Sequence, residues 1–194
     1  MKKGILVVIS GPSGAGKGTI VSRLLNELDN IGFSTSMTTR SPREGEVDGR
    51  DYFFVTQEDF KKAIEDDEFI EYANVHGNYY GTPKSEVRSR LEQGMNVLLD
   101  IDVQGAMNVK KSMPEGVFIF ISPPSMEELR RRLVGRGKDS IEDIEHRLRN
   151  AKGEMDFADK YDYHVVNDDI DIAVKEVKDI IIKEGSSHDA ISGN

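Results

Sequence analysis

The chain has 194 residues, a formal net charge of −9 and no cysteine. This length suits one domain, or one domain with small insertions, and can bury a sizeable core. Without cysteine there is neither a disulfide framework nor a thiolate metal site, and no apolar run approaches the roughly 18 residues of a membrane span. The absence of cysteine and of a membrane-spanning run leads us to expect a cytoplasmic protein that contacts no membrane. The acidic balance disfavours nucleic-acid binding.

The most informative stretch lies near the N-terminus. Residues 5–9 are an apolar, β-branched run typical of a buried parallel strand. Gly11 and Gly16 follow, separated by four residues, and Lys17 comes next, which is the spacing of a phosphate-binding loop. The candidate phosphate-binding residues are Gly11, Pro12, Ser13, Gly14, Ala15, Gly16, Lys17, Gly18 and Thr19.

The residue types of this loop suit anion binding. Glycines let backbone N–H groups converge on a phosphate, the positive end of the following helix points at the same place, and Lys17 adds a mobile charge. The alternative is a glycine-rich turn without a ligand, which the amphipathic pattern of Ile20, Leu24 and Leu28 makes less favourable. Gly18 stands where such loops usually carry the hydroxyl that ligates magnesium, so direct ligation by the loop stays open.

Residues 34–82 read as a strand-rich insert in an otherwise alternating chain. Arg40, Arg43, Tyr52 and Tyr80 lie in or beside it, and two guanidinium groups and two phenols can converge on a second phosphate. Each of them could equally be a solvated turn arginine or a half-buried tyrosine.

Glu71 is the unusual residue of this insert. In the alternating pattern of residues 68–76 it shares a face with Phe69 and Val75. A carboxylate on an apolar face needs a partner. A base with adjacent N–H donors, such as guanine, would supply one.

Strands and helices alternate again after residue 82, which predicts a parallel sheet covered on both faces. Residues 97–102 form a buried strand that ends in Asp100 and Asp102. Ligands of such sheets bind beyond the carboxyl ends of the strands, so we expect both carboxylates to lie beside the phosphate loop and to organise magnesium or its waters. In a regular strand the two would point to the same face.

A second, smaller insert covers residues 125–157. Ser140 and Asp143 start a helix with a capping box. Arg136 lies between glycines, and Arg147 lies off the apolar stripe of this helix. Both arginines are candidates to move with a lid and stabilise a migrating phosphoryl group.

Together these motifs resemble the guanylate kinases of bacteria, and the resemblance extends from Ile5 to about Glu184. It rests on residues 10–19, 38–46, 49–52, 69–71, 77–82, 99–105, 123–125, 132–137 and 166–168. It implies the α/β fold of P-loop nucleoside-monophosphate kinases, with a parallel sheet flanked by helices, a β-rich GMP-binding insert and a small helical lid. The implied core comprises residues 1–33, 83–124 and 158–184, the insert residues 34–82 and the lid residues 125–157. Residues 185–194 lie beyond the resemblance and are small and polar, so we expect a disordered tail there.

The resemblance also implies a reaction, the transfer of the γ-phosphoryl group of ATP to GMP, and also to dGMP, with magnesium. GMP would contact Ser36, Arg40, Arg43, Tyr52, Glu71, Tyr80, Thr82 and Asp102. ATP would contact residues 11–19 and Asn167, and the catalytic side chains would be Lys17, Arg40, Arg136 and Arg147. Asp100 would hold the metal directly or through water.

Three other functions stay open at this stage. Another nucleoside-monophosphate kinase is disfavoured by Glu71, Ser36 and Thr82, which suit guanine rather than adenine. A non-catalytic, guanylate-kinase-like scaffold is disfavoured by the intact Gly16 and Lys17. Only an activity assay distinguishes a nucleotide-binding regulator without turnover from a kinase. The sequence also leaves open whether the protein is a monomer or a homodimer.

Overall fold

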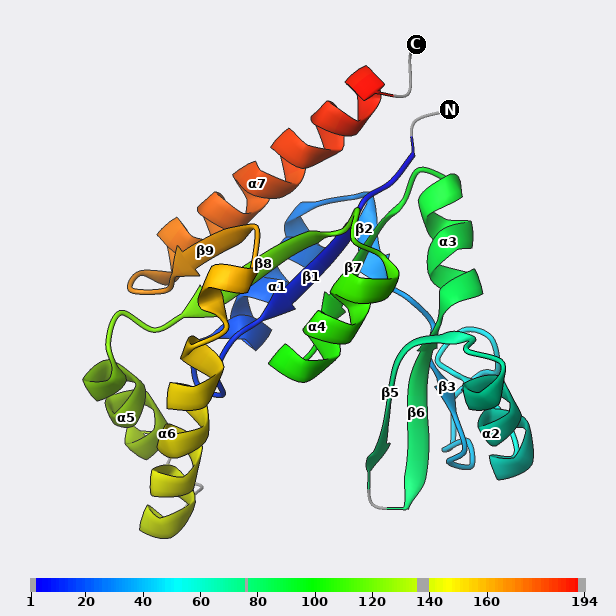
Figure 1. The fold of residues 1–194 in the computed structure, drawn as a ribbon, viewed down its shortest axis with the longest axis horizontal. Coiled ribbons are helices and arrows are strands. Elements are labelled where there is room, and N and C mark those ends of the chain that lie inside the picture. The colour runs from blue at the N-terminus through cyan, green and yellow to red at the C-terminus, as the bar shows by residue number, and fades with distance from the viewer. Residues whose placement is uncertain (1–2, 76, 136–139, 192–194) are drawn as a thin grey trace.

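The computed structural model describes residues 3–75, 77–135 and 140–191. Its centre is a five-stranded sheet in the order β2-β7-β1-β8-β9 (Figure 1). The strands are β1 (Leu6–Ser10), β2 (Ile31–Phe33), β7 (Asn96–Asp100), β8 (Val117–Ser122) and β9 (Tyr163–Val166). All four neighbouring pairs are parallel, which confirms the predicted α/β class.

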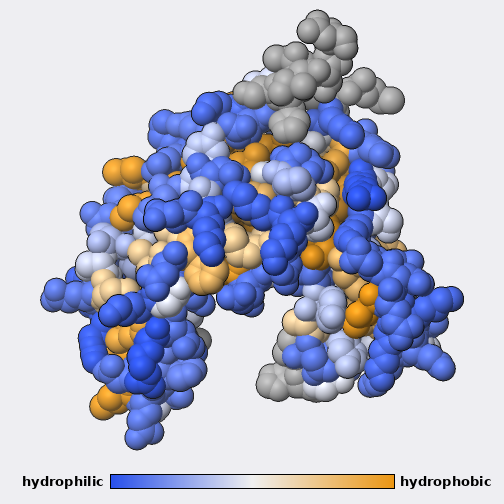
Figure 2. Space-filling view, in the orientation of Figure 1, coloured by the Kyte–Doolittle hydropathy of each residue, from blue (hydrophilic) through white to orange (hydrophobic). Residues whose placement is uncertain are grey.

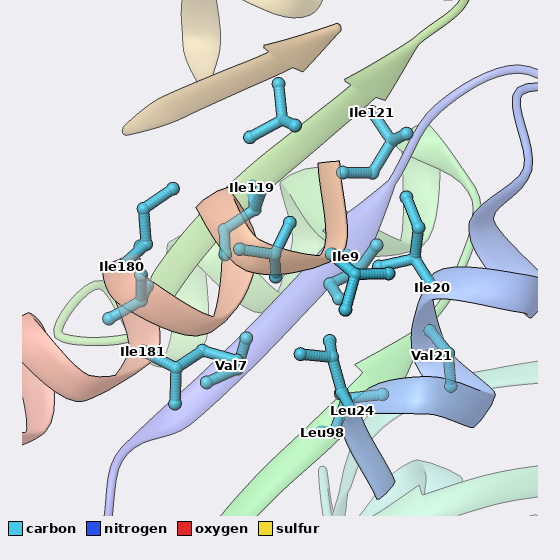
Figure 3. Packing of buried hydrophobic residues seen from close by; sticks show 14 of the residues in the cluster. Val7, Ile9, Ile20, Val21, Leu24, Leu98, Ile119, Ile121, Ile180 and Ile181 are labelled. Atoms are coloured by element: carbon cyan, nitrogen blue, oxygen red, sulfur yellow. The ribbon is translucent and has the colours of Figure 1, made fainter. Parts of the chain in front are cut away.

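Helices cover both faces of this sheet. Val7 and Ile9 of β1 point toward α1 (Lys17–Glu27) and α7 (Ile170–Ile191), as Figure 3 shows. The alternate residues of β1 belong to a second buried cluster, with α3 (Lys84–Glu92) and α4 (Val103–Ser112). A short 3-10 turn, Ala158–Lys160, precedes β9. None of the helices in these ranges is long and apolar enough to cross a bilayer.

The last helix extends further than the sequence predicts. The small, polar residues of the chain end predict a disordered tail over 185–194, but α7 continues to Ile191, and residues 192–194 lie outside the described residues. The difference is physical: Ile180 and Ile181 are buried on the central sheet, and the helix propagates beyond that anchored turn.

A second sheet is formed within residues 37–83. It has the order β4-β3-β6-β5 and mixes parallel and antiparallel pairs. Its elements are β3 (Met37–Thr38), β4 (Phe53–Phe54), β5 (Phe69–Val75), β6 (Asn78–Pro83) and the covering helix α2 (Gln57–Glu65). Phe60 of α2 stacks on Phe69 of β5 with ring centroids 4.4 Å apart, and this contact fixes the helix on the sheet.

A helical pair completes the fold. It consists of α5 (Met126–Gly135) and α6 (Ile141–Met155). The predicted capping box of Ser140 and Asp143 is present at the start of α6. The pair and the second sheet project from the same side of the central sheet (Figure 1), and a wide hollow separates them (Figure 2).

Candidate active site

The loop between β1 and α1 has the conformation that its glycines predict. Gly11, Gly14 and Gly16 have φ angles of 144°, 96° and 94°, which side chains other than hydrogen rarely permit. A Cβ atom at Gly11 would also overlap the backbone oxygen of Ile121. The loop therefore packs closely against the end of β8 and leads into the N-terminus of α1, where N–H groups are available to an anion.

Lys17 lies at the centre of this loop. Its Nζ donates to the backbone oxygen of Gly11 and, at 3.3 Å, to that of Pro12. Burial lowers the pKa of Lys17, and the charges of Asp100, Glu154 and Asp102 raise it in turn. A partly desolvated cation thus lies among three carboxylates at the end of the sheet.

The two aspartates at the carboxyl end of β7 occupy different places. Asp100 is the last residue of β7; surrounding protein atoms raise the pKa of its carboxyl group and Lys17 lowers it. Asp102 caps α4, and its Oδ1 accepts from the N–H of Gly105 at 2.7 Å. The two aspartates would share a face only in a regular strand, and that condition is not met, because β7 ends at Asp100 and the chain turns into α4.

The structure brings together the residues assigned to the acceptor phosphate. The Arg40 guanidinium lies 5.4 Å from the centre of the Tyr52 ring, and the rings of Tyr52 and Tyr80 are 6.1 Å apart. Hydrogen bonding to Glu46 raises the pKa of Arg40, and a smaller effect comes from Tyr80. Arg43 belongs to the same turn, since its backbone N–H donates to Glu46 at 2.7 Å.

Glu71 has the partner that a half-buried carboxylate requires. The hydroxyl of Thr82 donates to its Oε1 at 2.7 Å, across the pair β5 and β6. Burial raises the pKa of Glu71, while the Thr82 hydrogen bond lowers it. Both residues, with Ser36, Tyr52 and Asp100, line a cavity of about 310 Å³ between the two sheets. That volume is within the range of about 300–1,000 Å³ of ligand pockets.

Asn167 lies where β9 ends, and it contacts the phosphate loop. Its side-chain nitrogen donates to the backbone oxygen of Ala15 at 2.7 Å, and the residue is 4% exposed. A Cβ atom at Gly16 would overlap that same nitrogen. Its backbone oxygen accepts from Arg132 of α5 at 2.9 Å. The sequence assigned Asn167 to the ATP site, and this geometry favours support of the loop rather than contact with adenine.

We expect Asn167→Ala to weaken ATP binding by about tenfold, because the loop loses the hydrogen bond that holds Ala15 and must then be ordered when ATP binds. Asn167→Asp should be worse than alanine, since it places a carboxylate oxygen against the oxygen of Ala15. Titration calorimetry with ATP and with GMP measures both effects, and GMP affinity should stay constant. If Asn167→Asp binds ATP as well as the parent protein, the loop-support role is contradicted.

The arginines of the second insert are only partly described. Arg136 lies outside the described residues. Arg147 is half-buried on α6, and its charge contributes to the lowered pKa of Asp143, whose main cause is the hydrogen bond with Ser140. Its role in transfer stays a prediction.

The sequence analysis did not identify two acidic residues beside the candidate site, Glu154 in the second insert and Glu46 in the first. Glu154 of α6 lies close enough to Lys17 to raise its pKa, and its spacing of seven residues from Arg147 places both on one helix face. That spacing could have indicated it. Glu46 binds the two acceptor arginines, and its place three residues after Arg43 is typical of a closed turn.

Comparison with known proteins agrees with this geometry. The model of the family described as "Guanylate kinase" matches residues 3–184. A guanylate kinase of Caldanaerobacter subterraneus subsp. tengcongensis is 55% identical over 183 residues, covering 94% of this chain and 89% of the relative. One from Clostridium perfringens is 52% identical over 192 residues, covering 99% and 89%.

A solved structure supports the same conclusion. The crystal structure of guanylate kinase from Anaplasma phagocytophilum is 39% identical and has a TM-score of 0.66. The alignment covers 95% of this chain and 87% of that one. On the family match and these identities, the chain belongs to the guanylate kinase family.

Proposed function

We propose that this protein transfers the γ-phosphoryl group of ATP to GMP, giving ADP and GDP. The observation that carries the proposal is the Glu71–Thr82 pair in a cavity on the side of the sheet where the phosphate loop lies. An ionised Glu71 would accept hydrogen bonds from N1–H and N2–H of guanine, and the hydroxyl of Ser36, which lines the same cavity, would donate to O6. Thr82 lies on this O6 side as well, but its hydroxyl donates to Glu71 and would reach O6 only on releasing it. Adenine presents an acceptor at N1, so it leaves the carboxylate unpaired.

The proposed transfer depends on the alignment of the two nucleotides more than on a general acid or base. Arg40, Tyr52 and Tyr80 bind the phosphate of GMP, whose anionic oxygen is already a nucleophile, so no strong general base is required. The phosphate loop holds the phosphates of ATP, and Lys17 neutralises charge on the group in transfer. Both nucleotides occupy the same side of the central sheet, and dGMP is a second acceptor because these groups read base and phosphate rather than ribose.

The residues present fit a magnesium ion that arrives with ATP. Among the described residues no group of three or more His, Cys, Asp or Glu side chains forms a metal cage, and magnesium prefers one or two carboxylates, several waters and the phosphates of its substrate. Asp100 would hold it directly or through water, since Gly18 offers no hydroxyl. The ion would neutralise phosphate charge.

We expect two parts of the protein to move during the reaction, the second sheet with α2 and the helical pair α5 and α6. We infer that the second sheet and α2 belong to a GMP-binding insert (residues 34–82) and that α5 and α6 belong to a lid (residues 125–157). These two projections flank the hollow seen in Figure 2. Closure would exclude water, which otherwise hydrolyses ATP. Glu154 and Arg147 would then approach the phosphate loop from one face of α6.

We expect Arg147→Ala to lower kcat by at least roughly a hundredfold, a conservative part of the about 10³–10⁵ range of arginine fingers. GMP affinity should change little, because the contact forms only at the transition state. Steady-state kinetics and calorimetry measure the two quantities. The matched control is Arg149→Ala on the exposed side of α6. A mutant that keeps its turnover but loses GMP binding would move Arg147 to the acceptor site.

The reaction itself is tested by product analysis. The purified protein with ATP, magnesium and GMP should form ADP and GDP in equal amounts, without free phosphate. A regulator that binds nucleotides without turnover would form neither product, and an ATPase would release phosphate.

A further inference from the structure

Glu46 lies between the two arginines assigned to the acceptor phosphate. Its Oε1 accepts from the Arg40 guanidinium at 2.8 Å, and its Oε2 accepts from the backbone N–H of Arg43 at 2.7 Å. Its own N–H donates to the backbone oxygen of Arg43 at 3.1 Å, which closes the turn. One carboxylate therefore fixes the side chain of the first arginine and the backbone of the second.

The Arg40 guanidinium is held on its other sides as well. Its second terminal nitrogen donates to the backbone oxygen of Ser41 at 2.7 Å. The rings of Tyr52 and Phe54 lie 5.4 and 5.8 Å away. The side chains of Arg40 and Glu46 are only 15% and 21% exposed, so this ion pair is better shielded from solvent than the exposed pairs that contribute little.

We propose that Glu46 is a positioning residue for the acceptor phosphate, an inference that rests on the proposed function of Arg40 and Arg43. It holds the guanidinium at the orientation in which its remaining N–H groups meet the phosphate, and it holds the turn that carries Arg43. Pre-ordering these groups before the substrate arrives removes an entropic cost from GMP binding.

A positioning role for Glu46 and simple electrostatics predict opposite changes in GMP affinity when the carboxylate is removed. A carboxylate beside an anion-binding site repels the anion, so removing its charge should strengthen GMP binding. If Glu46 positions the arginines, removing it should weaken GMP binding instead. Glu44 provides the matched control, because it lies in the same turn, is exposed and carries the same charge.

The experiment compares Glu46→Gln, Glu46→Asp and Glu44→Gln in the complete protein. Glu46→Gln keeps the shape but presents an amide to one donor, and Glu46→Asp keeps the charge but is one methylene too short to reach both. We expect each to raise the KM for GMP by about tenfold, equivalent to about 1.4 kcal/mol, with the KM for ATP unchanged. Glu44→Gln should leave the KM for GMP unchanged or lower it slightly.

Guanosine separates positioning from general damage to the acceptor insert. It has the base but no phosphate, so its inhibition constant should be the same in the parent protein and in both Glu46 variants. A parallel loss of guanosine, GMP and ATP binding would show a structural role and overturn the inference. Glu46→Gln that binds GMP as Glu44→Gln does would also overturn it.

Failure of the underlying site is distinguishable from failure of this inference. Arg40→Ala tests the site directly, and it should raise the KM for GMP more than either Glu46 variant. If Arg40→Ala has no effect, the assignment of the acceptor phosphate is wrong, and the inference falls with it. If Arg40→Ala impairs GMP binding while both Glu46 variants do not, only the positioning role is overturned.

Discussion

Replacing Lys17 by methionine should lower turnover by about 10³-fold, since removing a preorganised stabilising charge costs about 10²–10³ and this one is the cation of the loop itself. Burial already lowers the pKa of Lys17, while three nearby carboxylates raise it. The charge therefore acts where solvent screens it little. Single-turnover kinetics with saturating ATP and GMP isolates the transfer step.

The fold should survive this substitution. Lys17 begins α1, and its polar contacts are with the backbone oxygens of the loop, so methionine opens no core cavity. The matched control is Lys175→Met, whose side chain is 76% exposed and pairs with Asp179 on α7. It should change neither turnover nor melting temperature. A folded, fully active Lys17→Met protein would remove the phosphate-loop assignment.

Replacing Glu71 by alanine should weaken GMP binding by at least about a hundredfold and leave ATP binding unchanged, because the guanine donors lose their acceptor. Thr82→Val should cause a smaller loss, since it removes only the hydrogen bond that orients the carboxylate. Calorimetry with each nucleotide measures the two affinities. Glu68→Ala is the control: Glu68 is an exposed carboxylate just before β5. Equal losses for GMP and ATP would place Glu71 outside the guanine pocket.

The same residue predicts a pH dependence. Burial raises the pKa of Glu71, so its carboxylate takes up a proton at a higher pH than an ordinary glutamate. Only the ionised form accepts both guanine hydrogens, so GMP affinity should fall as the pH drops through the raised pKa. Protonation of the GMP phosphate also weakens binding in acid, and the difference between the parent protein and Glu71→Ala removes that contribution.

The sequence predicts well those features that local pattern determines. The buried strands, the glycine loop and the capping box at Ser140 follow from periodicity, backbone freedom and capping chemistry, and all are present. The parallel sheet then follows from the alternation of strands and helices. The rule that ligands of parallel sheets bind beyond the carboxyl ends of the strands also predicts that Lys17 and Asp100 lie at the same edge of the sheet.

The remaining features depend on partners distant in the chain. Asn167 bonds to Ala15, 152 positions away, and no local pattern indicates that pairing. Asp102 was predicted inside the strand, but β7 ends two residues earlier, at Asp100, and Asp102 caps α4, because the end of a strand is less certain than its centre. Glu46 was overlooked because a turn glutamate is usually solvated, and only the folded turn reveals its two donors.

We propose that this protein selects its acceptor by the hydrogen-bonding edge of guanine. The most direct test is kcat/KM with ATP and three acceptors that share the same phosphate and ribose. GMP should be best. IMP lacks the 2-amino group and should lose about 10- to 100-fold, while AMP should lose about 10⁴-fold. Turnover of AMP or IMP equal to that of GMP would contradict the claim.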